Sequence, residues 1–154
     1  MKMSELVWSK HTNPWSVWTR IVSTPIPLLI LWFRSDLSWG VWPLLGAVAF
    51  WFWINPRMFP EPRKKDGWTS RSILGEKLWL SKSAPRPSGI EAVLIWASLA
   101  IGIAGLLCAV VGVWFYALPA TVFGAVSMMC SKVVFLMPMA ALYDRAVGSG
   151  NKWD

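Results

Sequence analysis

The feature that most constrains this chain is an apolar run from Ala120 to Tyr143, which is long enough to cross a bilayer. A helix needs about 20 predominantly apolar residues to span the hydrocarbon core. One charged residue, Lys132, lies in the middle of the run, and a charge at that depth costs roughly 2.5–3.5 kcal/mol on insertion scales. The run therefore predicts a membrane protein and makes Lys132 the residue to explain.

Three other stretches have the length of a membrane span. The four predicted spans cover residues 14–33, 37–54, 92–117 and 120–143. Short connections join the first to the second and the third to the fourth, so each pair should form a helical hairpin. The predicted fold class is all-α, a four-helix transmembrane bundle in one integral-membrane domain over residues 1–154. With 55% hydrophobic residues, the 154-residue chain leaves no room for a separate soluble domain.

Asparagine and proline set the expected ends of the first two helices. Asn13 is a good N-cap and Pro14 suits the first helical position, so the first span should begin there. Pro25 and Pro27 should kink this helix. The pair Asn55-Pro56 should end the second helix, because a residue before proline is pushed out of the helical region.

Positive charge sets the predicted orientation. Of the 15 Lys and Arg residues, all but Arg34 and Lys132 fall on the side that holds both termini and the middle loop, residues 55–89. By the positive-inside rule this side is cytoplasmic. The rule also accounts for the net charge of +7 without a nucleic-acid partner. Most of the 13 tryptophans lie near the predicted boundaries, where indole rings anchor a membrane protein.

The middle loop contains a predicted short amphipathic helix over residues 70–80, lying on the inner leaflet. Its apolar face would hold Ile73, Leu74, Leu78 and Trp79. Basic side chains in and near the loop are either ordinary positive-inside charges or contacts for anionic lipid, worth about 1 kcal/mol each near the surface. The candidate headgroup contacts are Arg20, Arg57, Arg63 and Arg71.

No internal ion pair is predicted for Lys132, because all eight acidic residues lie at or beyond the ends of the apolar runs. It would then face the bundle interior, neutral or bonded to backbone carbonyls or to Ser98, Ser127 or Ser131. Alternatively its partner comes from another subunit, an anionic lipid or a bound ligand. A third alternative is direct chemistry, such as a Schiff base.

The last two spans carry stripes of small residues, which let helices approach closely in lipid. The predicted packing residues are Ser98, Gly102, Gly105, Ala109, Gly112, Gly124, Ser127 and Ser131. Cys108 and Cys130 are the two cysteines, and each is 11 residues from Pro119. They should therefore lie at equal depth, either as small apolar side chains or as a redox or soft-metal pair. No metal site is predicted.

His11 is the one histidine of the chain. It cannot build a histidine cluster or supply both axial ligands of a bis-histidine haem, which leaves haem with histidine and methionine ligands as an alternative. No cofactor is predicted, and bound lipid is expected. His11 is either a structural residue near a helix start or a general base or headgroup contact on the cytoplasmic face.

Several motifs resemble those of a family of small prokaryotic integral-membrane proteins of uncharacterised function. They are His11–Arg20, Asn55–Pro60, Gly67–Arg71 and Leu74–Lys77. The resemblance implies a prokaryotic inner (cytoplasmic) membrane and brings no activity. It also implies a functional region on the cytoplasmic side, away from Lys132. The residues concerned are His11, Asn13, Arg20, Asn55, Arg57, Arg71 and Glu76.

The leading functional prediction is a non-catalytic accessory subunit that packs against another membrane protein, since no catalytic motif is visible. One alternative is an inner-leaflet enzyme acting on a lipid or lipid-linked substrate. In that case His11 or Glu76 would be the acid or base, and Arg57 and Arg71 would hold an anionic group. A second alternative is a small oligomeric transporter or channel that uses Lys132 as an anion or proton site.

Overall fold

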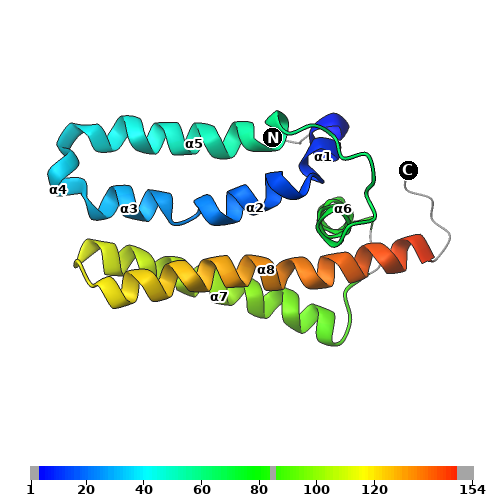
Figure 1. The fold of residues 1–154 in the computed structure, drawn as a ribbon. Helices are drawn as coiled ribbons and strands as arrows, with labels where there is room; N and C mark the ends of the chain where they lie inside the picture. The colour runs from blue at the N-terminus through cyan, green and yellow to red at the C-terminus, as the bar shows by residue number, and fades with distance from the viewer. Residues whose placement is uncertain (1–3, 84–85, 149–154) are drawn as a thin grey trace.

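The computed structural model describes residues 4–83 and 86–148, and every regular element in them is helical. In chain order the elements are α1 (Glu5–His11), α2 (Pro14–Ser23), α3 (Ile26–Trp32), α4 (Arg34–Leu37), the 3₁₀ turn η1 (Ser38–Gly40), α5 (Val41–Met58), α6 (Trp68–Leu80), α7 (Ile90–Trp114) and α8 (Leu118–Gly148). The predicted all-α class is confirmed. Figure 1 shows α2 and α3 following one another between α5 and α8, with α6 crossing α8 near one end.

Among residues 4–83 and 86–148, three segments are long and apolar enough to cross a membrane: Arg34–Met58, Ile90–Trp114 and Leu118–Gly148. They indicate a membrane protein. The stretch predicted as the first span, residues 14–33, forms two helices rather than one. The break falls at Thr24 and Pro25, between α2 and α3, where the two prolines remove backbone donors as expected.

The predicted start of α2 is confirmed. Asn13 is its N-cap, and its side-chain oxygen accepts a hydrogen bond from the Trp15 backbone N–H at 3.0 Å. The prediction that Asn55-Pro56 ends the second helix is wrong, because α5 continues to Met58. The Asn55 side chain is fully buried and bonds to two hydroxyls of α2, Ser16 and Thr19. These bonds hold the turn that contains the proline.

Helices α7 and α8 make the most extensive contact of the fold, along their small residues. A Cβ added at Gly105 would lie 2.9 Å from the Ser127 Cβ and 3.0 Å from the Gly124 carbonyl oxygen. One added at Gly124 would lie 2.7 Å from the Ala109 Cβ. The two stripes of small residues thus face each other, and their backbones approach more closely than larger side chains would allow.

The same register separates the two cysteines. The Cys108 thiol lies 3.5 Å from the Ala120 carbonyl oxygen, whereas Gly102 faces Ser131, the neighbour of Cys130. Cys130 is therefore level with about residue 103, some five residues from Cys108, or about 7 Å along the helix. The prediction of equal depth is wrong because the turn between α7 and α8 lies at residues 115–117, before Pro119.

Helix α6 packs against protein on its buried face. Ile73 and Leu78 are only 1% and 6% exposed, and Ile73 joins a cluster with Val17, Ile21 and Leu136 from α2 and α8. Gly75 gives the close approach, since a Cβ there would lie 2.6 Å from the Met139 carbonyl carbon. The helix expected to rest on the inner leaflet is therefore held to α8, and two of its four predicted apolar residues are core.

Arg34 joins the two helical hairpins at the end far from α6. Its guanidinium donates to the carbonyl oxygens of Leu31 (3.0 Å), Val113 (2.9 Å) and Trp114 (3.0 Å), and it stacks 4.1 Å from the Tyr116 ring centroid. These carbonyls are at the C-terminal ends of α3 and α7, which carry partial negative charge. This arginine therefore has a structural role.

Candidate functional site

A pocket of about 550 Å³ lies between α2, α6, α7 and α8, in the size range of small-molecule sites. Its polar lining includes His11, Arg20, Glu76 and Lys132. Much of the remaining lining is apolar. It includes Val17, Ile21, Phe52, Ile73, Leu99, Ile103, Leu106, Met128 and Phe135. Ile103 and Leu106 are 62% and 44% exposed, so the apolar side of the pocket opens on the outer surface of α7.

Lys132 has an internal partner, and the prediction that it has none is wrong. Its Nζ lies 3.2 and 3.4 Å from the two carboxylate oxygens of Glu76, and 4.9 Å from the Phe135 ring centroid. The Ser98 and Ser131 hydroxyls, which were candidate partners, donate instead to backbone carbonyls. Glu76 reaches Lys132 because α6 folds back onto α8. The Lys132 side chain stays 44% exposed, so it can still contact a ligand.

The packing of α6 was hidden by its composition. Its buried face includes Thr69, Ser70, Ser72 and Gly75, which count as polar or neutral in a hydropathy profile. A serine-rich face with a central glycine is nevertheless the composition that lets two helices approach closely. That pattern is the signal that could have brought Glu76 next to α8.

His11 holds Arg20 at the side of the pocket next to α1. One guanidinium nitrogen of Arg20 lies 3.1 Å from His11 Nε2, and Ser16 Oγ lies 2.9 Å from His11 Nδ1. Within residues 4–83 and 86–148, no carboxylate lies within 4 Å of the Arg20 guanidinium. Its positive charge is therefore held by a ring nitrogen and has no direct counter-ion there.

A chain of hydrogen bonds determines which nitrogen of His11 carries the proton. Ser16 donates its hydroxyl hydrogen to Asn55 Oδ1 at 3.0 Å, and Asn55 Nδ2 donates to Thr19 Oγ1 at 2.9 Å. Ser16 must then accept from His11 Nδ1–H. Nε2 consequently carries no hydrogen and accepts from Arg20. The imidazole is neutral in this arrangement.

Burial and two nearby cations keep His11 neutral. The side chain is only 6% exposed. Burial first, and then the positive charges of Arg20 and Lys132, lower the pKa of His11 from 6.5 to about 3. With both ring nitrogens engaged and the pKa far below neutrality, the geometry favours a role in holding Arg20 over the predicted role of general base.

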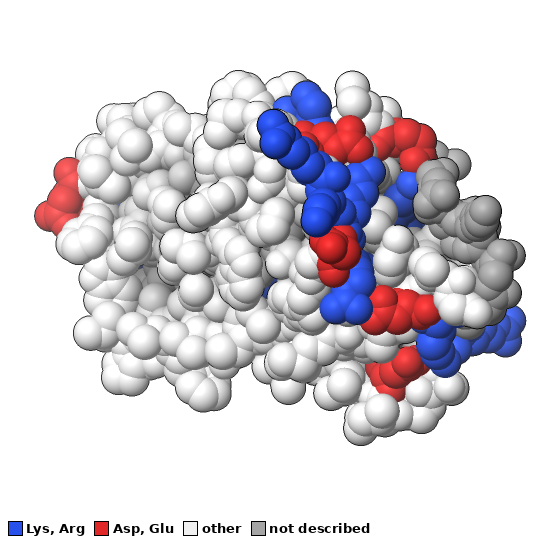
Figure 2. Space-filling model, turned by 45° about the vertical axis from the view of Figure 1, so that its right-hand side comes forward, with Lys and Arg blue, Asp and Glu red and all other residues white. Residues whose placement is uncertain are grey.

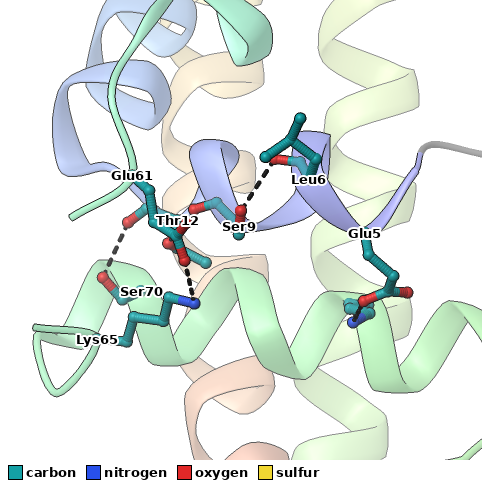
Figure 3. Close-up of polar contacts among 8 residues, drawn as sticks. Glu5, Leu6, Ser9, Thr12, Glu61, Lys65 and Ser70 are labelled. Carbon is teal, nitrogen blue, oxygen red and sulfur yellow. Dashed lines mark hydrogen bonds and ion pairs between the residues drawn. The ribbon is translucent and has the colours of Figure 1, made fainter. Parts of the chain in front are cut away.

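Contacts between α1 and α6 hold His11 and Glu76 on the same side of the pocket. The Ser70 hydroxyl donates to the Thr12 carbonyl oxygen at 2.8 Å (Figure 3). Lys77 pairs with Glu5 at 2.5 Å. Next to them, Glu61 and Lys65 pair at 2.7 Å in the loop before α6. Polar bonds therefore fasten α1 across α6 at both ends, and each helix contributes one polar residue to the lining.

The other arginines predicted as anion contacts do not line the pocket. Arg57 stacks 4.5 Å from the Trp53 ring centroid and donates to the Trp53 carbonyl oxygen. Arg71 pairs with Asp144 at 2.8 Å, and Arg63 is exposed. The enzyme hypothesis required Arg57 and Arg71 to converge with His11 and Glu76. This prediction is wrong, because neither arginine lines the pocket. The cations that do meet are Arg20 and Lys132.

The charge of the site follows from these contacts. Arg20 and Lys132 are positive, Glu76 is negative, and His11 is neutral, so the pocket has one excess positive charge. Charged side chains of both signs gather at the α6 end of the molecule, as Figure 2 shows. Lys2 and Lys152, which the charge count assigned to the same side, lie outside the described residues. The pocket, with its one excess positive charge, can therefore bind an anion next to an apolar surface.

The fold and site define a class: a small helical protein with a pocket that joins two cations to an apolar groove and, in the part of the chain that the structure describes, three helices that could span a membrane. The chain belongs to the family of unknown function DUF6653, whose model matches residues 2–153. No curated protein and no solved structure matches the chain. The description of the family assigns no function, so the geometry of the site is the basis for inferring one.

Proposed function

We propose that the protein binds an anionic amphiphile from the inner leaflet, with the head group at Arg20 and Lys132 and the chain along the apolar side of the pocket. One observation carries the proposal. An arginine with no carboxylate within 4 Å among the described residues and an apolar surface open on α7 line the same pocket. An anion fits the first and a hydrocarbon chain fits the second, because each replaces a contact that water or lipid would otherwise make.

The proposal places the pocket in a four-span protein of a prokaryotic inner membrane. The spans are α2 with α3, α4 with α5, α7, and α8, with both termini and the middle loop in the cytoplasm. Trp96 and Trp114 on α7 support it, since they are 68% and 71% exposed. They are 18 positions apart, or about 27 Å of helix, close to a hydrocarbon core of roughly 30 Å.

The depth of the cations agrees with a ligand from the inner leaflet. Ser131, next to Lys132, faces Gly102 on α7, six positions beyond Trp96. Six residues correspond to about 9 Å of helix. The ammonium can extend toward the interface from that depth. A head group bound there would place its chain toward the bilayer centre, where Ile103 and Leu106 are exposed on α7.

Photolabelling tests the proposal. A phosphatidylglycerol with a diazirine in its acyl chain is mixed into phosphatidylcholine nanodiscs that hold the protein, and the adducts are mapped by mass spectrometry. Adducts should concentrate on Ile103, Leu106 and Met128, and Arg20→Gln should disperse them. Labelling spread evenly over all lipid-facing helices, with no effect of Arg20→Gln, would contradict the proposal.

The accessory-subunit hypothesis stays a prediction. One of its supports, a Lys132 without an internal partner, is gone because Glu76 pairs with it. The surface left for a partner would be α5, since only 6% of an 18-residue apolar window in Arg34–Met58 is buried inside the molecule. Cross-linking in native membranes that recovers a second protein on α5 would support that role, and recovery of the isolated chain would count against it.

A further inference from the structure

The acceptor that holds Arg20 determines whether its charge is available to a ligand. A carboxylate in the position of His11 Nε2 would fix the guanidinium equally well, but it would also cancel its charge. A neutral imidazole fixes the guanidinium through one hydrogen bond of 3.1 Å and leaves the charge uncancelled. In a partly buried site this difference is large, because charges interact more strongly at low dielectric than in water.

We infer that the ligand of this pocket carries a single negative charge on its head group, and that His11 is the positioning residue that keeps the Arg20 charge available to it. The inference rests on the proposed function and deepens it. Glu76 lies 3.2 Å from Lys132 and also attracts Arg20, so two cations and one carboxylate leave one excess positive charge. One anionic group brings the total charge of the occupied site to zero.

The net charge of the site distinguishes between classes of amphiphile. A phosphodiester or a carboxylate on an apolar chain satisfies Arg20 and can contact the exposed part of Lys132. A phosphocholine head group has no net charge and adds a quaternary ammonium beside two cations. The site should therefore prefer phosphatidylglycerol and oleate, which share the single anion, over phosphatidylcholine. Measuring both anionic ligands distinguishes a phospholipid from a free fatty acid.

The hydrogen bonds that position His11 also have a defined donor-to-acceptor direction. Ser16 and Asn55 are fully buried, and their hydrogen bonds run in one direction from His11 Nδ1–H to Asn55. They require the Nδ1–H tautomer, because the Nε2–H form would direct a hydrogen at the Arg20 donor. A measurement of the His11 tautomer therefore reports directly on the hydrogen bonds that position the Arg20 guanidinium.

The first test uses the fact that the chain has one histidine. Labelling with ¹⁵N-histidine gives imidazole signals from His11 alone, in phosphatidylcholine nanodiscs with or without phosphatidylglycerol. The expected result is a neutral Nδ1–H imidazole from pH 5 to pH 8 in both lipid compositions. A protonated imidazolium at pH 7, or the Nε2–H tautomer, would overturn the assignment of His11.

The second test compares His11→Gln with His11→Glu, two side chains of the same shape that differ in charge. Apparent affinity for phosphatidylglycerol and for oleate is measured in phosphatidylcholine nanodiscs by lipid exchange and native mass spectrometry. His11→Glu should bind the anions at least tenfold more weakly than His11→Gln, although both have similar thermal stability. Equal affinity would overturn the role of His11. If His11→Glu fails to fold, two other measurements test the role of His11. They are the tautomer of His11 and the affinity of His11→Gln relative to that of Arg20→Gln.

Failure of this inference is distinguishable from failure of the proposed function. If the wild-type protein binds neither anionic lipid, the proposed function itself is wrong. If it binds them and the two His11 variants are equal, the pocket is an anion site in which His11 has no electrostatic role. A preference for phosphatidylcholine over phosphatidylglycerol would overturn the single-anion assignment.

Discussion

Gly75 is the position where α6 meets α8, and replacing it should detach the two helices. A Cβ added there would lie 2.6 Å from the Met139 carbonyl carbon and closer still to the carbonyl oxygen, whereas ordinary van der Waals contact begins at 3.4 Å. In Gly75→Ala the helices must therefore separate by more than 1 Å. Overpacking of this kind costs roughly 1–3 kcal/mol, and the better helix propensity of alanine returns at most about 1 kcal/mol.

The matched control is Gly46→Ala in α5, where an added Cβ would have nothing within 4 Å. Unfolding in mixed detergent micelles, followed by circular dichroism, should show Gly75→Ala less stable than wild type by about 1–2 kcal/mol. Gly46→Ala should be neutral or slightly stabilising. A retreat of α6 should also lengthen the 3.2 Å pair between Glu76 and Lys132. The reasoning is refuted if both alanine variants are equally stable.

Three further predictions concern charged and titratable groups. A double-mutant cycle of Glu76→Gln and Lys132→Met should give a coupling energy of roughly 0.5–1 kcal/mol. The expected energy is modest because the lysine side chain is 44% exposed. Additive effects of the two substitutions would mean that the pair does not form. Lowering the pH from 6.5 toward 3 should destabilise the wild type by up to about 1.4 kcal/mol per pH unit more than His11→Gln, because in that range the unfolded chain binds a proton that the buried imidazole does not. Equal pH profiles of the two proteins would show that His11 is not buried and neutral. Arg34→Met should lower stability by roughly 1–3 kcal/mol through the loss of its carbonyl bonds, while Arg63→Met, at an exposed site, should match the wild type in the same unfolding assay.

Hydropathy predicted the long helices well, because a run of some 20 apolar residues has few other structures available to it. The start of α2 was also predictable, since the capping by Asn13 depends only on its neighbours in sequence. The end of α5 was missed for the opposite reason. Asn55 is held by Ser16 and Thr19, 39 and 36 positions away, and no local rule for Asn-Pro contains those contacts.

The site was predicted in part. The motifs that carry the family resemblance contain His11, Arg20 and Glu76, and all three line the pocket. Their link to Lys132 was missed because it depends on α6 folding back onto α8. Its contact face is formed by serine, threonine and glycine, which hydropathy does not count as core. Hydropathy finds surfaces that avoid water, whereas this contact depends on close backbone approach at Gly75.

The central claim is that Arg20 and Lys132 bind an anionic amphiphile. Native mass spectrometry of the protein extracted from its own membranes in a mild detergent tests it most directly, with Arg20→Gln and Lys132→Met measured beside the wild type. The account predicts one retained anionic lipid or fatty acid per wild-type chain. Retention should fall at least tenfold in Arg20→Gln, and it should fall by a smaller factor in Lys132→Met. Retention of the same lipids by all three proteins, or of none by the wild type, would contradict it.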